Sequence, residues 1–192
     1  MLSDRELYNP EFKDFGKISR LRTIECLITE KIDGTNAQIL VPEDPTLPVL
    51  AGSRNRFIDV VHDNFGFASF VAEHAEMFRR LGPGRHFGEW WGQGIGRRYD
   101  QPLKRLSLFN VDRYARMGGL PEGLPSNVDL VPVLYRGAID TLVIQATIDA
   151  LYALGSVAVP GWMKPEGVIV QIPSAGVRWK VTDNGDAHKG TQ

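Results

Sequence analysis

The 192-residue chain is poor in cysteine and contains no long hydrophobic run. Its one cysteine, Cys26, has no partner for an internal disulfide, and the apolar stretch around it predicts a buried thiol. No apolar run approaches the ~20 residues that a membrane-spanning helix needs. The first residues also lack the basic and then apolar layout of a signal peptide. These absences predict a cytoplasmic protein with no disulfide framework and no membrane partner.

The composition is that of a globular chain, with 43% hydrophobic and 23% charged residues. A length of 192 residues predicts a single domain, which we place at 1–192. The net charge of −1 argues against a basic coat protein for nucleic acid. Residues 54–116 nevertheless carry eleven basic and seven acidic side chains, a local charge of +4. The arginines of this segment either lie on solvated faces or contact a phosphate-rich partner.

Hydrophobic periodicity predicts several short strands and two helices. Helical spacing covers 67–81, which is followed by Gly82-Pro83-Gly84, and 139–154, which is followed by Gly155. The first two strands are expected to pair as a hairpin through the turn Asp33-Gly34-Thr35. The order of the elements predicts an α+β fold with mainly antiparallel sheets and inserted helices. The expected strands are 23–31, 36–41, 49–53, 85–91, 106–113, 130–135, 168–172 and 177–181.

Several common site motifs are missing or have the wrong spacing. The run Gly92-Gln93-Gly94-Ile95-Gly96 looks like a dinucleotide loop, but its glycines are wrongly spaced and no helix start follows it. The chain has no GxxxxGK[ST] phosphate loop and no GxSxG elbow for a serine nucleophile. The four histidines lack the spacing of metal ligands. These patterns give no support to a dinucleotide enzyme, a P-loop enzyme or a serine hydrolase.

One set of segments occurs in a specific order. The segments are Thr29-Glu30-Lys31-Ile32-Asp33-Gly34-Thr35-Asn36, Ser53-Arg54, Phe87-Gly88-Glu89-Trp90-Trp91, Pro165-Glu166-Gly167-Val168-Ile169-Val170 and Val177-Arg178-Trp179-Lys180-Val181. Their order and spacing resemble the covalent nucleotidyltransferase superfamily of polynucleotide ligases and capping enzymes. Within it, the chain is most similar to the ATP-dependent RNA ligases of the RNA ligase 2-like group. Thr35-Asn36 directly after KIDG, and Phe109 twenty residues beyond Glu89, favour that group.

The resemblance covers about 23–182 and implies a nucleotidyltransferase (ATP-grasp-like) domain of the ligase type. It implies that Lys31 is the nucleophile, which attacks the α-phosphorus of ATP, expels pyrophosphate and keeps AMP as a phosphoramidate. Arg54 is expected near the ribose and phosphates, and Glu89 at the ribose hydroxyls. The backbone at Glu30 is expected to help read the adenine edge. The ring of Phe109 is expected to stack on the purine, which is worth ~1–3 kcal/mol.

Three further residues and a metal ion belong to the implied site. Glu166 matches the acidic residue associated with the catalytic metal, and Lys180 matches the lysine that neutralises charge on the α-phosphate. Asn36 falls in the family motif with a supporting role in nucleotide binding. The implied cofactors are ATP and Mg²⁺ (or Mn²⁺), because such ions suit carboxylate and phosphate oxygens. The implied partners are RNA ends, a 5′-phosphate and a 3′-hydroxyl, including those at a nick in duplex RNA.

The chain departs from the family pattern in two places. Arg178 stands where the RNA ligase 2-like group usually has a lysine, so the charge is kept but the compact ammonium is not. We still expect Arg178 to contribute to nucleotide binding. Only twelve residues follow Lys180, so we expect no C-terminal accessory domain, and an accessory protein could take over its role in holding RNA.

Other functions stay open on the sequence alone. A DNA ligase or a GTP-using capping enzyme uses the same lysine chemistry, although KIDGTN and the expected lack of a C-terminal domain disfavour both. A nucleotide- or RNA-binding protein without turnover has no need of a lysine nucleophile. An unrelated α+β fold is the remaining alternative. Covalent labelling separates these functions, because a ligase forms an adenylate and a capping enzyme forms a guanylate.

Overall fold

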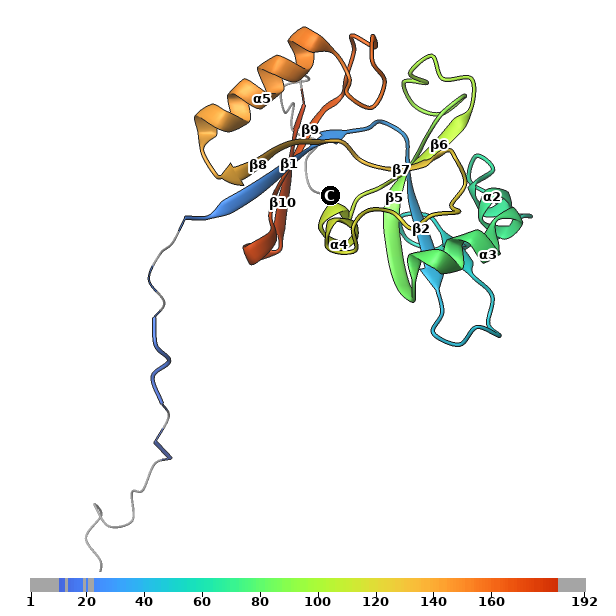
Figure 1. Ribbon diagram of the computed structural model, residues 1–192, viewed down its shortest axis with the longest axis horizontal. Helices are drawn as coiled ribbons and strands as arrows, with labels where there is room; N and C mark the ends of the chain where they lie inside the picture. The colour runs from blue at the N-terminus through green and yellow to red at the C-terminus, as the bar shows by residue number, and fades with distance from the viewer. Residues whose placement is uncertain (1–10, 13, 19, 21–22, 183–192) are drawn as a thin grey trace, which may run out of the picture.

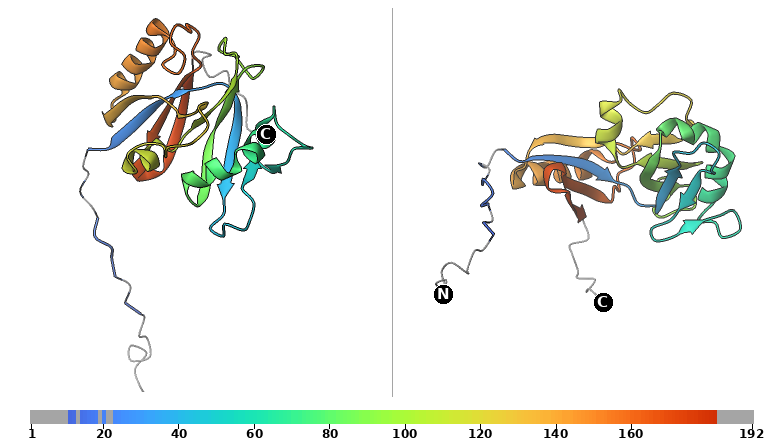
Figure 2. Two further views of the ribbon diagram at one scale, coloured as in Figure 1. Left: turned by 45° about the vertical axis from the view of Figure 1, so that its right-hand side comes forward. Right: turned by 90° about the horizontal axis from the view of Figure 1, so that it is seen from below.

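The computed structural model describes residues 11–12, 14–18, 20 and 23–182, and the folded part contains two β-sheets side by side (Figure 1, Figure 2). The smaller sheet has the order β10-β9-β1-β8, and every neighbouring pair in it is antiparallel. Its strands are β1 (Glu25–Lys31), β8 (Val133–Ala138), β9 (Gly167–Ile172) and β10 (Val177–Thr182).

The larger sheet has the order β4-β3-β2-β5-β6-β7. Its pairs are antiparallel except for β6 and β7, which run parallel. The strands are β2 (Thr35–Val41), β3 (Leu50–Gly52), β4 (Phe57–Ile58), β5 (Gly84–Gly92), β6 (Lys104–Leu108) and β7 (Val128–Leu130). The prediction of an α+β fold with mainly antiparallel sheets and inserted helices is confirmed.

Each sheet buries one face under helices, so each sheet has an apolar core of its own (Figure 1). Helix α5 (Thr141–Leu154) packs Ile148 and Leu151 against the smaller sheet, where Cys26 is 1% exposed, as the sequence predicts. Helices α2 (Phe67–Glu73) and α3 (Ala75–Phe78) cover the larger sheet and continue into a 3₁₀ turn at Arg79–Leu81. Among the described residues, no helix has the length and apolar character needed to cross a membrane.

The expected hairpin between the first two strands is wrong. Strand β1 pairs with β8 and β9, whereas β2 pairs with β3 and β5, so the two strands belong to different sheets. The segment between them crosses from one sheet to the other, and Ile32 is buried in a third apolar cluster that joins the sheets. Gly34 lies so close to β5 that a Cβ there would be 2.4 Å from the carbonyl oxygen of Trp90. The Asp-Gly turn therefore serves a crossover, not a hairpin.

Three other predicted elements are interrupted. The helix predicted over 67–81 breaks at His74, which ends α2 and begins α3. The strand predicted over 106–113 ends at Leu108, and α4 (Val111–Arg116) follows because the Asn110 side chain accepts a hydrogen bond from the Arg113 backbone and caps the helix. The strand predicted over 130–135 divides into β7 and β8 around Pro132, which has no backbone N–H to give to a sheet.

Candidate active site

A pocket of about 330 Å³ lies where the two sheets meet, a volume in the range of small-molecule sites. The smaller sheet supplies one wall and the larger sheet supplies the other. Every residue predicted to bind nucleotide lines this pocket. The lining residues are Thr29, Glu30, Lys31, Ile32, Asn36, Arg54, Glu89, Phe109, Val131, Ile169, Gln171, Arg178, Trp179 and Lys180.

Strand register explains how the smaller sheet presents its basic side chains. Thr29 of β1 pairs with Ile169 of β9, which pairs with Lys180 of β10, so these three residues form one row on the same face. The neighbouring row brings Gln171 beside Arg178. Alternation along the strands therefore places Arg178 and Lys180 together on the pocket wall. No binding role was predicted for Thr29, Ile169 or Gln171, although the period of two along these strands indicates them once the register is known.

Lys31 and Glu166 form an ion pair at the crossover between the sheets. Lys31 is the last residue of β1 and pairs with Gly167, the first residue of β9, which brings the preceding Glu166 beside it. The Lys31 Nζ lies 2.5 Å from Glu166 Oε2, and the two side chains are 24% and 18% exposed. Gly167 has φ 148°, and a Cβ there would be 2.1 Å from the Val181 carbonyl oxygen. A glycine is therefore needed directly after Glu166 for β10 to approach.

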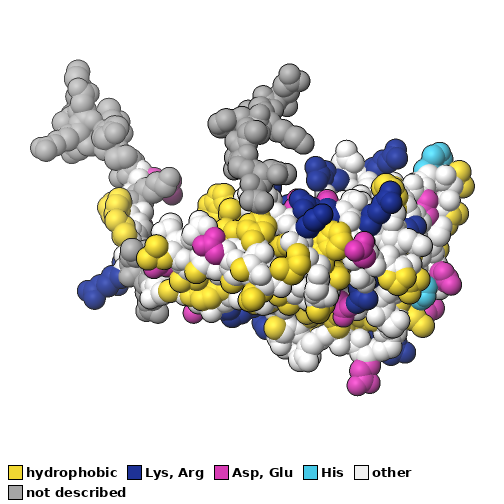
Figure 3. Space-filling view, turned by 90° about the horizontal axis from the view of Figure 1, so that it is seen from above, with side chains coloured by type: hydrophobic (Ala, Val, Ile, Leu, Met, Phe, Trp, Pro, Cys, Tyr) yellow, Lys and Arg dark blue, Asp and Glu magenta, His cyan; other side chains and the backbone are white. Residues whose placement is uncertain are grey.

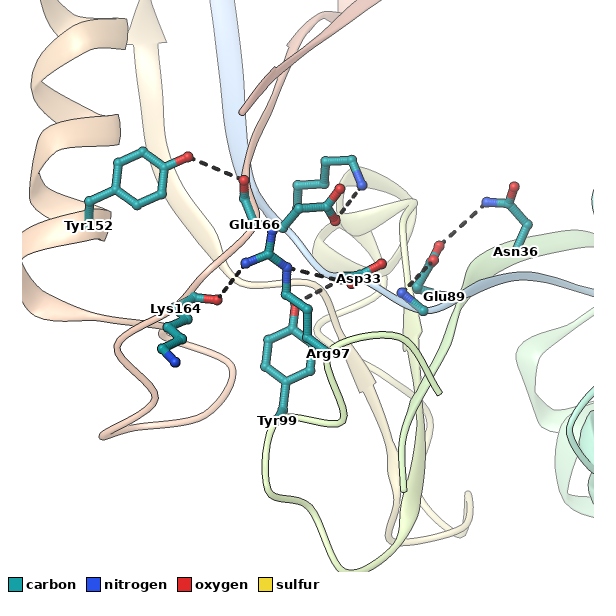
Figure 4. Close-up of polar contacts among 10 residues, drawn as sticks. Asp33, Asn36, Glu89, Arg97, Tyr99, Tyr152, Lys164 and Glu166 are labelled. Atoms are coloured by element: carbon teal, nitrogen blue, oxygen red, sulfur yellow. Dashed lines mark hydrogen bonds and ion pairs between the residues drawn. The ribbon is translucent and has the colours of Figure 1, made fainter. Parts of the chain in front are cut away.

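On the opposite wall, Glu89, Asn36 and Arg54 form a hydrogen-bonded chain. Asn36 of β2 and Glu89 of β5 are register partners. The Glu89 carboxylate accepts hydrogen bonds from the Gly34 backbone at 3.1 Å and from Asn36 Nδ2 at 3.4 Å (Figure 4). Arg54 Nε donates to Asn36 Oδ1 at 2.6 Å, which fixes the amide with its nitrogen toward Glu89. Asn36 thus holds both neighbours in place, and its supporting role in nucleotide binding stays a prediction.

Burial raises the pKa of the Glu89 carboxyl from its ordinary 4.5 to about 7, against the lowering effects of the nearby Lys31 charge and of the Gly34 hydrogen bond. The unfolded chain releases this proton near 4.5, whereas the folded chain retains it until about 7. The wild-type protein therefore loses stability as the pH rises through that interval, and a glutamine at position 89 does not.

We expect the difference in unfolding free energy, Glu89→Gln minus wild type, to increase by about 3 kcal/mol from pH 4.5 to pH 7. This value follows from the rise of the Glu89 pKa from 4.5 to about 7 on folding. Urea denaturation of both proteins at several pH values measures the difference. Glu122→Gln, at an exposed position, is the matched control and should show no such trend. A pH-independent difference for Glu89→Gln would contradict the assignment.

The side chain of Glu30 is used for a structural contact with the loop after α5. It is 1% exposed and accepts hydrogen bonds from Ser156 Oγ at 2.5 Å and from the backbone of Val157 and Ala158 at 2.9 Å each. The carboxylate therefore anchors the loop that follows α5. This use of the side chain is compatible with the predicted role of Glu30, which concerns its backbone at the pocket.

The glycine-rich run set aside as a dinucleotide loop has a different role. Its continuation packs on the turn after Lys31, where the Asp33 backbone donates to the Tyr99 hydroxyl at 2.8 Å. Arg97 Nε lies 3.5 Å from Asp33 Oδ2, and Arg97 also donates to the Lys164 carbonyl at 3.2 Å (Figure 4). Arg98, Tyr99 and Asp100 all have φ between 50° and 62°, a left-handed conformation that costs free energy in non-glycine residues. The loop thus fixes the crossover that bears Lys31.

The Glu166 carboxylate fits a magnesium or manganese ion whose remaining ligands are waters and the phosphates of a nucleotide. The described residues contain no group of three or more His, Cys, Asp or Glu side chains able to hold a metal by themselves. Mg²⁺ usually retains several waters and binds through one or two carboxylates together with substrate phosphates. Glu166 provides one such carboxylate at the pocket edge, beside Lys31.

Comparisons with known proteins give a family and a fold for this chain. The RNA ligase family model matches residues 24–182, whereas no curated protein sequence matches the chain. Among solved structures, an unliganded variant of a Naegleria gruberi RNA ligase superposes with a TM-score of 0.61 at 16% identity, covering 88% of this chain and 52% of that one. A second variant with ATP and Mn has TM-score 0.61, 15% identity and coverages of 93% and 60%. A third, with AMP and Mn, has TM-score 0.61, 16% identity and coverages of 87% and 52%.

The chain thus spans 52–60% of the length of these solved structures, and the likeness establishes the fold that they share. The family match extends over nearly all of the folded part, from the start of the smaller sheet to the end of β10. The chain belongs to the RNA ligase family.

Proposed function

We propose that this protein is an ATP-dependent RNA ligase that forms a covalent lysyl-AMP intermediate on Lys31 and then joins a 5′-phosphate to a 3′-hydroxyl end. The observation that carries the proposal is the position of the Lys31 amine. It lies at the edge of a nucleotide-sized pocket between an acidic partner, Glu166, and a wall that bears Arg178 and Lys180. The Naegleria gruberi RNA ligase structures with ATP and Mn, and with AMP and Mn, support the choice of nucleotide and metal.

In the first step, the neutral Lys31 amine forms a bond to the α-phosphorus of ATP, the bond from that phosphorus to the bridging oxygen breaks, and pyrophosphate leaves. Lys31 must therefore lose one proton to solvent before it attacks, and its nitrogen loses a second proton as the phosphoramidate forms. The ion pair with Glu166 occupies the same amine that must attack. Lys180 and Arg178, two residues apart on β10 of the same sheet, face the same cavity and can neutralise the phosphate charge.

Glu166 would hold the divalent ion, with phosphate oxygens and waters as the remaining ligands. When bound, the ion supplies positive charge that neutralises the carboxylate and the triphosphate. The Glu166 carboxylate would then have the ion as a partner in addition to the Lys31 amine. Asn36 and Glu89 keep their hydrogen-bonded places on the other wall, where the ribose hydroxyls are expected.

The later steps transfer AMP from Lys31 to the 5′-phosphate of RNA and then join that end to a 3′-hydroxyl with release of AMP. These steps need a polynucleotide in register with the pocket. An accessory protein, or the strands of a nicked duplex, can help to hold it.

The test of the proposal is covalent labelling of the purified chain with ATP or GTP, each labelled at the α-phosphate, with Mg²⁺ or Mn²⁺. We expect ATP to label the protein and GTP to label it poorly. Labelling of RNA ends then tests transfer to a 5′-phosphate. Equal labelling by GTP would instead support a capping-type enzyme. Nucleotide binding without any covalent label would support a binding protein without turnover.

Replacement of Phe109 should affect ATP affinity and the rate of AMP labelling differently. It follows β6, its backbone donates to the Phe87 carbonyl at 2.8 Å, and its ring lines the pocket. We expect Phe109→Ala to weaken ATP binding by about 1–3 kcal/mol, the contribution of one base stack. The rate of labelling at saturating ATP should change much less. Titration calorimetry together with labelling at several ATP concentrations measures both, and a lower saturating rate with unchanged affinity would contradict the stacking role.

A further inference from the structure

Next to the pocket, the larger sheet exposes two aromatic rings on the face that also bears Asn36 and Glu89. Phe87 of β5 pairs with Gln38 of β2, which pairs with Gly52 of β3, and Gly52 pairs with Phe57 of β4. Partners across antiparallel strands point to the same side, so these residues form one row across four strands. Phe87 and Phe57 are 49% and 48% exposed. We call this surface the Phe57–Phe87 face.

Arginines surround this row. Arg85 lies two residues before Phe87 on the same face of β5, and its guanidinium carbon is 5.6 Å from the centre of the Phe57 ring. Arg54 and Arg56 lie between β3 and β4, and Arg178 comes from β10 of the other sheet. Within the part of the chain that the structure describes, none of these four arginines forms an ion pair. Their charges are therefore available to a ligand.

The Phe57–Phe87 face continues into the nucleotide pocket through two hollows. One of about 280 Å³ is lined by Arg54, Arg56, Phe57 and Arg85, and it shares Arg54 with the pocket. The other, of about 350 Å³, is lined by Arg85, Phe87, Phe109 and Arg178, and it shares the last two with the pocket. The acidic side chain in the second hollow, Asp112, is paired with Arg136. Figure 3 shows basic side chains gathered over the half of the molecule that contains the larger sheet.

We propose that the Phe57–Phe87 face binds two or three nucleotides of single-stranded RNA next to the end that is joined. The inference rests on the proposed ligase function and extends it to the grip on RNA. Exposed aromatic rings on a sheet stack unpaired bases, and arginine forks bind phosphates and stack on rings. The row crosses three strand spacings, a distance of ~14 Å, which suits a platform for two or three bases. Because the face is continuous with the pocket, a bound RNA strand is directed toward Lys31.

Charge distribution explains why a chain with net charge −1 can hold RNA. Arg54, Arg56 and Arg85 belong to the segment of local charge +4, and Arg178 lines a hollow together with Arg85, so attraction acts where the strand approaches. A few phosphate contacts give modest affinity that falls with salt. The face therefore predicts weak, salt-sensitive sealing by the chain alone, and stronger sealing when a pre-adenylylated strand or a partner protein is added.

The test measures the anisotropy of a short single-stranded RNA with a fluorescent 3′ end, titrated with the full chain between about 50 and 200 mM salt. We expect Phe57→Ala and Phe87→Ala each to raise Kd about 5- to 150-fold, the equivalent of one lost base stack. Arg85→Gln should lower the slope of log Kd against log salt by about 0.7, the value for one phosphate contact on a single strand. Neither Phe57, Phe87 nor Arg85 lines the nucleotide pocket, so self-adenylylation should stay within twofold of the wild type.

The matched controls are Phe15→Ala, an aromatic that is 84% exposed outside this face, and Arg116→Ala on α4. Both should leave Kd unchanged. Phe87→Leu keeps the apolar bulk without the ring, so its weaker RNA binding with normal self-adenylylation would support stacking independently of folding. Unchanged RNA affinity in the Phe57, Phe87 and Arg85 variants, or an equal loss in the controls, would overturn the inference. Absence of any AMP label on the wild-type chain would instead contradict the proposed ligase function, and RNA binding would still report on the face.

Discussion

Replacing Lys31 by arginine is expected to abolish the covalent AMP label completely, although the positive charge at the site is kept. Lys31 Nζ lies 2.5 Å from Glu166 Oε2, and a guanidinium can form the same kind of ion pair. A guanidinium remains protonated at any working pH, however, and has no free electron pair to attack phosphorus. Lys31→Ala should give the same result for a simpler reason, because no amine remains.

A lysine-to-arginine change at a second position is the matched control for Lys31→Arg. Lys164 is exposed near the site, and the Arg97 contact uses its backbone carbonyl, not its amine. Lys164→Arg should therefore label like the wild type. The label on the wild type should be acid-labile and alkali-stable, as expected of a phosphoramidate, and peptide mapping should place it on Lys31. An AMP group on any other residue, or a labelled Lys31→Arg protein, would contradict the assignment.

The outlines of most strands could be predicted from the sequence, because their residues alternate or form short apolar runs between turn signals. The partners of the strands could not. Asp33-Gly34 has the composition of a hairpin turn, but β1 finds its neighbours β8 and β9 more than a hundred residues away along the chain. Burial of Ile32 between the sheets and the close approach of Gly34 to Trp90 decide the crossover. These are tertiary contacts that local pattern does not contain.

The same distinction applies to the site. The predicted nucleotide-binding residues lie around one pocket because the family resemblance relates segments that are far apart in the chain. The support given by Tyr99 and Arg97 to Asp33 could not be predicted, since it depends on a loop with three left-handed residues and no regular pattern. The side-chain anchor made by Glu30 was also missed. Its position beside Lys31 indicated a site residue, whereas its partners Ser156 and Val157 come from the loop after α5.

Glu166→Gln is expected to reduce the rate of AMP labelling by about 100-fold or more at fixed Mg²⁺, the size of effect seen when one charge-stabilising group is removed from an active site. The amide is nearly the same size as the carboxylate but carries no charge to hold a divalent ion. It also leaves Lys31 without its acidic partner, 2.5 Å away in the wild type. Loss of the ion pair by itself would free the amine and favour attack. A large fall in rate therefore indicates that the main role of the carboxylate concerns the ion and the phosphates.

Metal titration separates these two roles of Glu166. The Mn²⁺ concentration for half-maximal labelling should rise in Glu166→Gln, and Glu166→Asp, which keeps the charge on a shorter side chain, should lie between the variant and the wild type. Unfolding free energies should differ by less than about 1 kcal/mol, because the pair is partly exposed, at 24% and 18%. Glu43→Gln, at an exposed position, is the matched control for the change of charge. Labelling by Glu166→Gln with the metal dependence of the wild type would show that the ion is held elsewhere. Glu89, which lines the pocket together with Lys31, would then be the residue to replace.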